Sequence, residues 1–134
     1  MLAQFDLDPK AQSGLLPGGY KQRLAMATGL LHEPEILFLD EPTSGIDPLA
    51  RRAFWRTITR LSQSGVTIII TTHFMEEAEY CDRIAIQDAG EMLAIGTPRE
   101  VRALAGGSGA QDMNSAFIAI VEAARRQRKA GAAA

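Results

Sequence analysis

Two adjacent carboxylates, Asp40 and Glu41, directly follow a run of four apolar residues, and Pro42 comes next. The apolar run Ile36 to Leu39 predicts a short buried strand, which a proline ends. Ligands of α/β proteins collect at the carboxyl ends of strands. One carboxylate there can hold Mg²⁺ beside a nucleotide phosphate, and a second can orient an attacking water. A buried strand that ends in a helix-capping acid explains these residues equally well.

Three further segments surround this pair and decide between the two interpretations. Upstream lies Leu16-Pro17-Gly18-Gly19-Tyr20-Lys21-Gln22-Arg23, and downstream lie Thr43-Ser44-Gly45-Ile46-Asp47-Pro48 and Thr71-Thr72-His73. With the carboxylate pair, they resemble the signature loop, Walker B strand, D-loop and switch histidine of the ATP-binding cassette (ABC) transporter ATPases. Each motif alone is weak, but four in the family's order are very specific. The resemblance runs from about Leu16 to Val101.

The resemblance implies a role for each acidic residue and for the histidine. Asp40 would hold Mg²⁺, and Glu41 would polarise the attacking water or accept its proton, tasks that suit ordinary carboxylates in phosphoryl transfer. His73 would sense the γ-phosphate of ATP. It ends a predicted strand, so parallel pairing would put it at the same sheet edge as Glu41. The implied cofactors are ATP and Mg²⁺.

The segment Pro17 to Tyr20 corresponds to the signature loop. Gly18 and Gly19 open a predicted helix, where backbone N–H groups favour an anion; by themselves, two glycines before a helix are more often a turn. The resemblance implies that this loop reaches across a dimer to the γ-phosphate held by the opposite cassette. Pro17 and Tyr20 depart from the family's common Leu-Ser-Gly-Gly-Gln, which removes a hydroxyl and an amide from that contact.

Ser44 and Asp47 lie in the segment that resembles the D-loop. Asp47 followed by Pro48 predicts the cap and first residue of the next helix. The resemblance adds that this loop contacts the partner cassette and organises the attacking water, which places Ser44 and Asp47 among the expected cofactor-binding residues. The two roles of Asp47 are compatible.

A phosphate-binding loop of the form G-x-x-x-x-G-K-[ST] does not occur in the sequence. Such a loop supplies the backbone N–H groups and the lysine that grip the phosphates. We therefore expect the C-terminal portion of a cassette, inactive by itself. Residues 1–104 would belong to the ATPase domain, and residues 105–134 would form a Gly-rich linker and a C-terminal helix.

Composition indicates an intracellular α/β protein of one domain or less. The 134 residues carry a net charge of −2, which gives no support for a nucleic-acid or anionic-membrane surface. The single cysteine, Cys81, excludes an internal disulfide framework. The longest apolar run, around Val66 to Ile70, is too short to cross a bilayer. The expected location is cytoplasmic, on the inner face of a membrane through a partner.

The predicted elements alternate between helix and strand, which is typical of an α/β protein with a parallel sheet. The resemblance makes this part of a P-loop NTPase fold, with parallel core strands, flanking helices and a C-terminal β-hairpin. Buried strands are expected at the carboxylate pair and at Val66 to Thr72. Helices are predicted at Gly18 to about His32, about Pro48 to Ser64, Phe74 to Tyr80, Pro98 to Leu104 and about Met113 to Lys129. The hairpin is expected to pair Arg83 to Gln87 with Glu91 to Ile95.

Burial and exposure of several side chains follow from the same patterns. Leu24, Ala27, Leu30 and Leu31 should line the inner face of the first long helix, and Phe117, Ile118 and Val121 that of the last one. Two charged groups should lie on solvated faces: Glu76, Glu77, Glu79 and Asp82, and the basic tail Arg125, Arg126, Arg128 and Lys129.

The expected function is the ATP-binding subunit of an ABC transporter, working with a second cassette, as a homodimer or tandem domain, and with a membrane-spanning subunit. The segments Thr43 to Pro48, Phe74 to Arg83 and Met113 to Ile118 resemble exporter cassettes of the multidrug and ABC-2 kind. Nucleic acid is not an expected partner. Two alternatives stay open: an ABC-type ATPase that acts on DNA or ribosomes, and a non-enzymatic module that pairs with another cassette without binding ATP itself.

Overall fold

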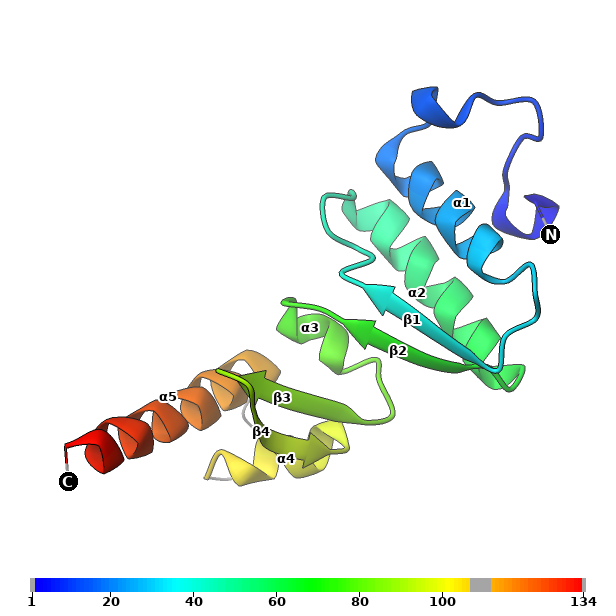
Figure 1. The fold of residues 1–134 in the computed structure, drawn as a ribbon. Coiled ribbons are helices and arrows are strands. Elements are labelled where there is room, and N and C mark those ends of the chain that lie inside the picture. The colour runs from blue at the N-terminus through cyan, green and yellow to red at the C-terminus, as the bar shows by residue number, and fades with distance from the viewer. Residues whose placement is uncertain (1, 107–111, 134) are drawn as a thin grey trace. The chain divides into compact units, whose positions relative to one another are not determined.

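The computed structural model describes residues 2–106 and 112–133, which form alternating helices and strands (Figure 1). The chain divides into two compact units, Met1–His73 and Phe74–Ala134. We call them unit 1 and unit 2 and describe each by itself. The α/β class predicted from the sequence is confirmed, with a parallel sheet in unit 1 and an antiparallel hairpin in unit 2.

Unit 1 combines a two-stranded parallel sheet with helices. Its elements are the 3-10 turns η1 (Leu2–Phe5) and η2 (Ser13–Leu15), the helices α1 (Gly18–Gly29) and α2 (Pro48–Gln63), and the strands β1 (Ile36–Asp40) and β2 (Thr67–Thr71). The strands pair in register from Ile36 opposite Thr67 to Asp40 opposite Thr71. The predicted parallel strand–helix–strand arrangement is therefore confirmed, and the carboxyl ends of both strands meet at one edge.

Local sequence signals set the ends of the two helices of unit 1. The backbone N–H groups of Tyr20 and Lys21 donate to the Pro17 carbonyl at 2.9 and 3.0 Å. The Asp47 carboxylate caps α2 by accepting from the Ala50 N–H at 2.9 Å, with Pro48 in the first turn. Helix α1 ends at Gly29, before the predicted His32, because the chain turns over residues 30–33, where Glu33 has a φ of +51°.

The core of unit 1 lies between the helices and one face of the sheet. The Phe54 and Trp55 rings meet edge to face, with centroids 5.8 Å apart. Leu31 is exposed, contrary to the prediction, because it lies in the turn after α1. The buried apolar side chains include Met26, Ala27, Leu30, Leu37, Phe54, Trp55, Ile58 and Leu61.

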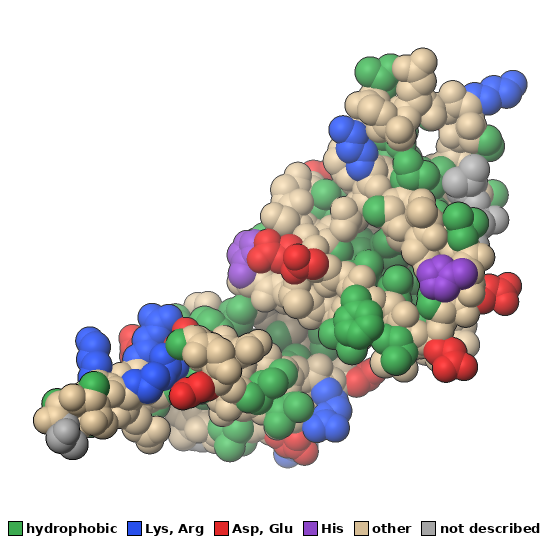
Figure 2. Space-filling model, viewed as in Figure 1, with side chains coloured by type: hydrophobic (Ala, Val, Ile, Leu, Met, Phe, Trp, Pro, Cys, Tyr) green, Lys and Arg blue, Asp and Glu red, His purple; other side chains and the backbone are tan. Residues whose placement is uncertain are grey.

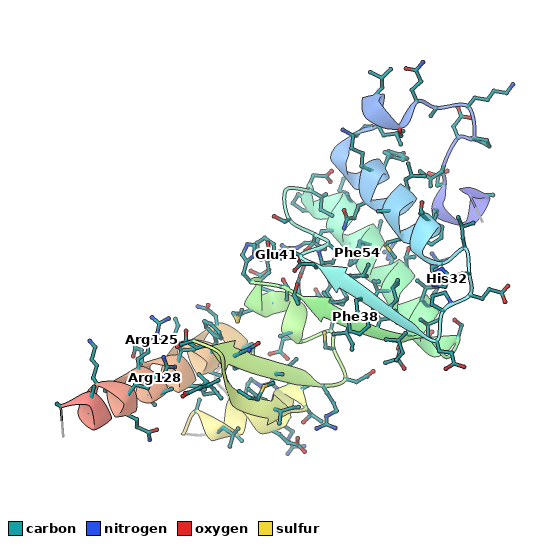
Figure 3. All side chains as sticks on the ribbon, viewed as in Figure 1. His32, Phe38, Glu41, Phe54, Arg125 and Arg128 are labelled. Atoms are coloured by element: carbon teal, nitrogen blue, oxygen red, sulfur yellow. The ribbon has the colours of Figure 1, made fainter. Side chains whose placement is uncertain are left out.

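The prediction of fully buried strands is wrong for one face of this sheet. Side chains alternate across the two strands, so Leu37 is buried while Ile36, Phe38 and Ile69 are 52%, 71% and 46% exposed. Figure 2 shows hydrophobic side chains over the sheet, and Figure 3 shows Phe38 on it. The helices of unit 1 cover only the face that carries Leu37.

Unit 2 is a β-hairpin packed with three helices. Its elements are α3 (Met75–Ala78), β3 (Ile84–Asp88), β4 (Glu91–Gly96), α4 (Pro98–Leu104) and α5 (Met113–Ala132). The strands pair antiparallel around Ala89 and Gly90, which have φ values of +53° and +80°. The predicted hairpin and the two helices that follow it, α4 and α5, are thus confirmed. The core consists of Ile86, Ala94, Val101, Met113 and Val121.

Capping side chains stabilise the first turns of α4 and α5. Thr97 and Glu100 form a capping box at α4, with the Thr97 hydroxyl accepting from the Glu100 N–H and the Glu100 carboxylate from the Thr97 N–H. The Asp112 carboxylate caps α5 by accepting from the Ser115 N–H at 2.7 Å, and this bond lowers the pKa of the Asp112 carboxyl. The predicted linker Ala105 to Ala110 lies mostly outside the described residues.

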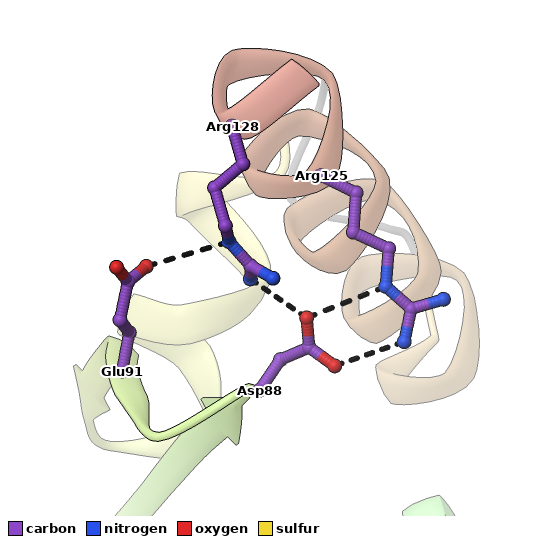
Figure 4. A network of polar contacts seen from close by, with 4 residues as sticks. All are labelled: Asp88, Glu91, Arg125 and Arg128. Carbon is purple, nitrogen blue, oxygen red and sulfur yellow. Dashed lines mark hydrogen bonds and ion pairs between the residues drawn. The ribbon is translucent and has the colours of Figure 1, made fainter. Parts of the chain in front are cut away.

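An ion-pair network joins the hairpin turn to α5 (Figure 4). Asp88 accepts from Arg125 Nη2 at 2.9 Å and from Arg128 Nη2 at 2.7 Å. Arg128 Nε lies 3.5 Å from Glu91 Oε2. Hydrogen bonds from Arg125, and then from Arg128, lower the pKa of Asp88 to about 2. Arg125 is 62% exposed, in agreement with the predicted solvated tail, whereas Arg128 is only 33% exposed, contrary to that prediction.

Two other side chains of unit 2, Glu77 and Ile118, differ from their predicted environments, while Glu79 is exposed as predicted. Glu77 is buried, at 1% exposure, because α3 turns it inward. Glu79 forms an ion pair with Arg102 of α4. Ile118 is exposed, because the inner stripe of α5 follows Met113, Ala116, Phe117, Ile120 and Val121 at helical spacing.

Candidate functional site

The carboxyl edge of the β1–β2 sheet brings four polar side chains together. The register sets Asp40 directly opposite Thr71, and the Thr71 hydroxyl donates to Asp40 Oδ1. Just beyond the strand ends, His73 Nδ1 lies 3.3 Å from Glu41 Oε1. Figure 3 labels Glu41 at this edge. The predicted proximity of Glu41 and His73 is confirmed, while their catalytic roles remain predictions.

Glu41 has an unusual backbone conformation. Its φ of +43° lies in the left-handed region, which costs a non-glycine residue about 1 kcal/mol. Its N–H donates both to the Thr71 carbonyl at 3.0 Å and to the Thr71 hydroxyl at 3.1 Å. Its carbonyl accepts from the Ser44 N–H at 3.1 Å. Such strained residues cluster at functional sites, and hydrogen bonds hold this one on both sides.

The two side chains in contact at this edge are more than half exposed. The Glu41 and His73 side chains are 51% and 57% exposed. A polar contact with this exposure contributes little to stability, because solvent screens it. The contact between Glu41 and His73 therefore adds little to the stability of the fold, and both side chains can be reached by a ligand.

Asp40 supplies one carboxylate to this edge. Among the described residues, no three His, Cys, Asp or Glu side chains gather closely enough to hold a metal ion. Mg²⁺ is commonly held by one or two carboxylates together with substrate phosphates and water. Asp40 therefore fits the donor chemistry of Mg²⁺ that arrives with a nucleotide, although it would make a weak site alone.

The loop between β1 and α2 leaves this edge through a compact turn. Pro42 and Thr43 are buried, whereas Ser44 is exposed and Gly45 has a φ of +74°. Asp47 then caps α2, which confirms its predicted structural role. The binding roles predicted for Ser44 and Asp47 remain untested by this geometry.

The loop that opens α1 packs beside this turn. A Cβ added to Gly18 would lie 3.9 Å from Ile46 Cγ2, an ordinary contact, whereas one added to Gly19 would lie 3.0 Å from the Cβ of Ala50. Gly19 is therefore needed for the close approach of α1 to α2. The first N–H groups of a helix have no partner inside the helix, so the opening of α1 can bind an anion.

The two unusual residues of this loop have distinct environments. Pro17 occupies the N-cap of α1, where it forms no side-chain cap. The guanidinium of Arg23 lies over the Tyr20 ring, and its central carbon is 4.9 Å from the ring centroid. Tyr20 therefore stacks within its own helix.

Thr71 is a site residue that sequence reasoning missed. In the sequence it stands out only as part of the segment Thr71-Thr72-His73 before the histidine. Its contact with Asp40 depends on the exact register between β1 and β2, which a single sequence does not specify. The available signal was its position two residues before His73, at the end of the neighbouring predicted strand.

Known proteins match this chain in sequence and in structure. A family model described as "AAA domain, putative AbiEii toxin, Type IV TA system" matches residues 12–77. The chain is 54% identical over 108 residues to the "Probable multidrug ABC transporter ATP-binding protein YbhF" of Escherichia coli K12, covering 79% of this chain and 19% of that protein. A solved ATP-binding subunit of an ABC transporter matches with a TM-score of 0.76 and 28% identity, over 90% of this chain and 51% of that one. The chain belongs to the ATP-binding cassette family.

A further ABC structure shows a nucleotide-bound state. The ATP-binding cassette MJ0796, in a dimeric post-hydrolysis state with ADP and Pi, matches with a TM-score of 0.63 and 26% identity over 72% of this chain and 43% of that one. The present chain thus spans part of an ABC cassette, and the predicted P-loop NTPase fold is confirmed. Within residues 2–106 and 112–133, no helix has the length and hydropathy needed to cross a membrane.

Proposed function

We propose that the full-length protein is the ATP-binding subunit of an ABC transporter and that it hydrolyses ATP at the carboxyl edge of β1 and β2. One observation carries the proposal: Asp40 and Glu41 lie at that edge, and His73 Nδ1 is 3.3 Å from Glu41 Oε1. Phosphoryl transfer needs a group that holds the metal ion, a base and a group that contacts the phosphate, all close together. Asp40, Glu41 and His73 are residues of suitable types for these three roles, and they lie at one sheet edge.

Each of these side chains has its own task in the proposed reaction. Asp40 would hold Mg²⁺, and the ion would supply charge compensation for the phosphate oxygens. Glu41 polarises the attacking water or accepts its proton. His73 donates to the γ-phosphate and, through its contact with Glu41, links that phosphate to the base. Burial of the edge by ATP would strengthen these interactions by excluding water.

The opening of α1 completes a second, composite half of the site. The segment Pro17 to Tyr20 directs helix N-terminal N–H groups at the γ-phosphate on a partner cassette, and Ser44 and Asp47 contact the same interface. The dimeric MJ0796 structure with ADP and Pi supports this pairing. The two loops lie beside each other, since a Cβ added at Gly18 would be in ordinary contact with Ile46, and this supports joint movement of the signature loop and the D-loop.

The proposed partner is a membrane-spanning subunit, which couples ATP hydrolysis to transport. The similarity to a multidrug ABC transporter ATP-binding protein favours export as the direction of transport. Attachment to such a subunit would hold the protein at the cytoplasmic face of the membrane. By itself, the chain of 134 residues is proposed to be inactive, because its sequence lacks the loop that grips the phosphates.

ATPase measurements on the full-length protein test this proposal. The protein is purified alone and reconstituted with its membrane-spanning subunit in nanodiscs. We expect Mg²⁺-dependent ATP hydrolysis that the membrane subunit stimulates, and no stimulation by DNA or ribosomes. Activity that responds to DNA or ribosomes and not to the membrane subunit would overturn the transporter assignment, and no hydrolysis in any arm would overturn the ATPase assignment.

A further inference from the structure

We infer that Thr71 is a positioning residue for ATP hydrolysis, whose hydroxyl holds the Asp40 carboxylate and the Glu41 main chain in one fixed arrangement. This inference rests on the proposed function. It adds a residue from the neighbouring strand to the carboxylate pair.

The hydrogen bonds of Thr71 determine how its hydroxyl is oriented. A threonine hydroxyl has one proton to donate and lone pairs to accept. An ionised carboxylate can only accept, so the proton goes to Asp40 Oδ1. A lone pair of Thr71 Oγ1 then accepts the Glu41 N–H at 3.1 Å. One side chain thus connects the two carboxylate-bearing residues.

The consequence is a defined direction for both acidic side chains. With Asp40 Oδ1 engaged by Thr71, Oδ2 remains available for a cation. The Glu41 N–H is shared between the carbonyl and the hydroxyl of Thr71, which supports the left-handed φ of +43°. That conformation turns the Glu41 side chain to the 3.3 Å contact with His73.

Thr67 provides a matched control on the same strand. It lies four residues before Thr71, so its side chain points to the same face of β2, and both residues are exposed. Its partner across the sheet is the apolar Ile36, whereas Thr71 faces Asp40. Thr→Val keeps the branched shape and the strand propensity. A purely structural role for the threonines predicts equal effects of Thr67→Val and Thr71→Val.

The first arm of the test is kinetic and uses the full-length protein with its membrane subunit. We expect Thr71→Val to lower kcat about tenfold or more, the effect of losing one hydrogen bond to a charged group, with KM for ATP within about threefold of wild type. Thr71→Ser keeps the hydroxyl and should retain most of the activity, and Thr67→Val should behave as wild type. Thr71→Ala against Thr67→Ala makes the same comparison if Thr71→Val does not fold.

The second arm measures metal binding without turnover. Mn²⁺ binding in the presence of ATP is followed by electron paramagnetic resonance in the Glu41→Gln background. We expect Thr71→Val to weaken Mn²⁺ binding several-fold, while Thr71→Ser and Thr67→Val leave it unchanged. The melting temperatures of the two valine variants should agree within a few degrees.

The outcomes separate this inference from the proposed function. An active wild type in which Thr71→Val keeps normal kcat and Mn²⁺ affinity, or in which Thr71→Ser is as impaired as Thr71→Val, would overturn the role of the hydroxyl and leave the ATPase assignment intact. A wild-type protein without Mg²⁺-dependent hydrolysis would overturn both.

Discussion

At the residue scale, the two glycines that open α1 differ in their surroundings although the sequence makes them look equivalent. Gly19 abuts Ala50, whereas a side chain at Gly18 would meet only ordinary contacts. A substitution at Gly19 therefore combines a packing defect with any effect on ATP. Gly18 is the position at which the proposed phosphate contact can be tested separately.

We predict that Gly18→Asp in the full-length protein with its membrane subunit abolishes ATPase activity while ATP binding and melting temperature stay close to wild type. The added carboxylate repels the γ-phosphate of the partner cassette and opposes closure of the dimer. Pro17→Ala is the control and should cost far less, because proline offers no hydroxyl to lose. Wild-type activity of Gly18→Asp would show that this loop is a structural turn.

Residue types and spacing predicted the pair Glu41 and His73, because parallel strands bring their carboxyl ends to one edge. They did not predict Thr71, whose contact depends on register, or the stacking of Tyr20 on Arg23. Arg23 lies three residues after Tyr20 in α1, so helical geometry allows this contact. The sequence does not determine which neighbouring side chain covers the Tyr20 ring. Side-chain contacts within an element were harder to foresee than the elements themselves.

At the element scale, helix starts were well predicted, because caps are local signals. Asp47 with Pro48 and Asp112 each mark a helix start that the structure contains. Exposure of a sheet face was not predicted, because an apolar run such as Ile36 to Leu39 is compatible with neighbours on both faces. The pairing of Arg125 with Asp88 was missed because the two residues lie far apart in sequence.

The packing of α1 on α2 gives a second prediction. Gly19→Ala should lower the stability of unit 1 by roughly 1–3 kcal/mol, because the new methyl group would meet the Ala50 Cβ at 3.0 Å. Ala50→Gly removes the opposing methyl group, so the double variant should recover part of that loss despite the lower helix propensity of glycine. Chemical denaturation of all four proteins measures the coupling. Strictly additive effects would contradict the contact.

The Asp88 network gives a third prediction, for pH. The pKa of Asp88 is about 2 in the folded chain, below its usual value near 3.9. The stabilisation is therefore present above about pH 4 and is lost as the pH falls towards 2. Asp88→Asn should destabilise unit 2 at pH 6, and its difference from wild type should shrink below about pH 3.

Hydrogen exchange of the α5 amides between pH 2 and pH 6 measures this difference. The control is Arg126→Gln, which alters an exposed arginine next to Arg125 and should leave the pH profile as it is. A constant difference between Asp88→Asn and wild type over the whole range would exclude a titrating ion pair at this position.

At the scale of the whole molecule, the chain carries the sheet edge at which we propose hydrolysis, and its sequence contains no loop of the kind that grips the phosphates. We predict that the isolated chain of 134 residues binds MgATP weakly or not at all, since Asp40 alone is a poor Mg²⁺ ligand. Titration calorimetry with ATP and Mg²⁺ measures this, with Asp40→Asn as the control. Micromolar, Mg²⁺-dependent affinity that Asp40→Asn removes would contradict the prediction.

Glu41→Gln in the full-length protein with its membrane subunit tests whether the Glu41 carboxylate acts on the attacking water. The amide keeps the shape of the side chain and loses the charge that polarises water. The measurement is steady-state ATPase activity beside equilibrium ATP binding, with Glu35→Gln, before the other end of β1, as the matched control. We predict a loss of turnover of about a hundredfold or more, the usual contribution of a general base, with ATP binding retained and Glu35→Gln fully active. A fall in turnover of less than about tenfold would contradict it, because Glu41 would then not be the base.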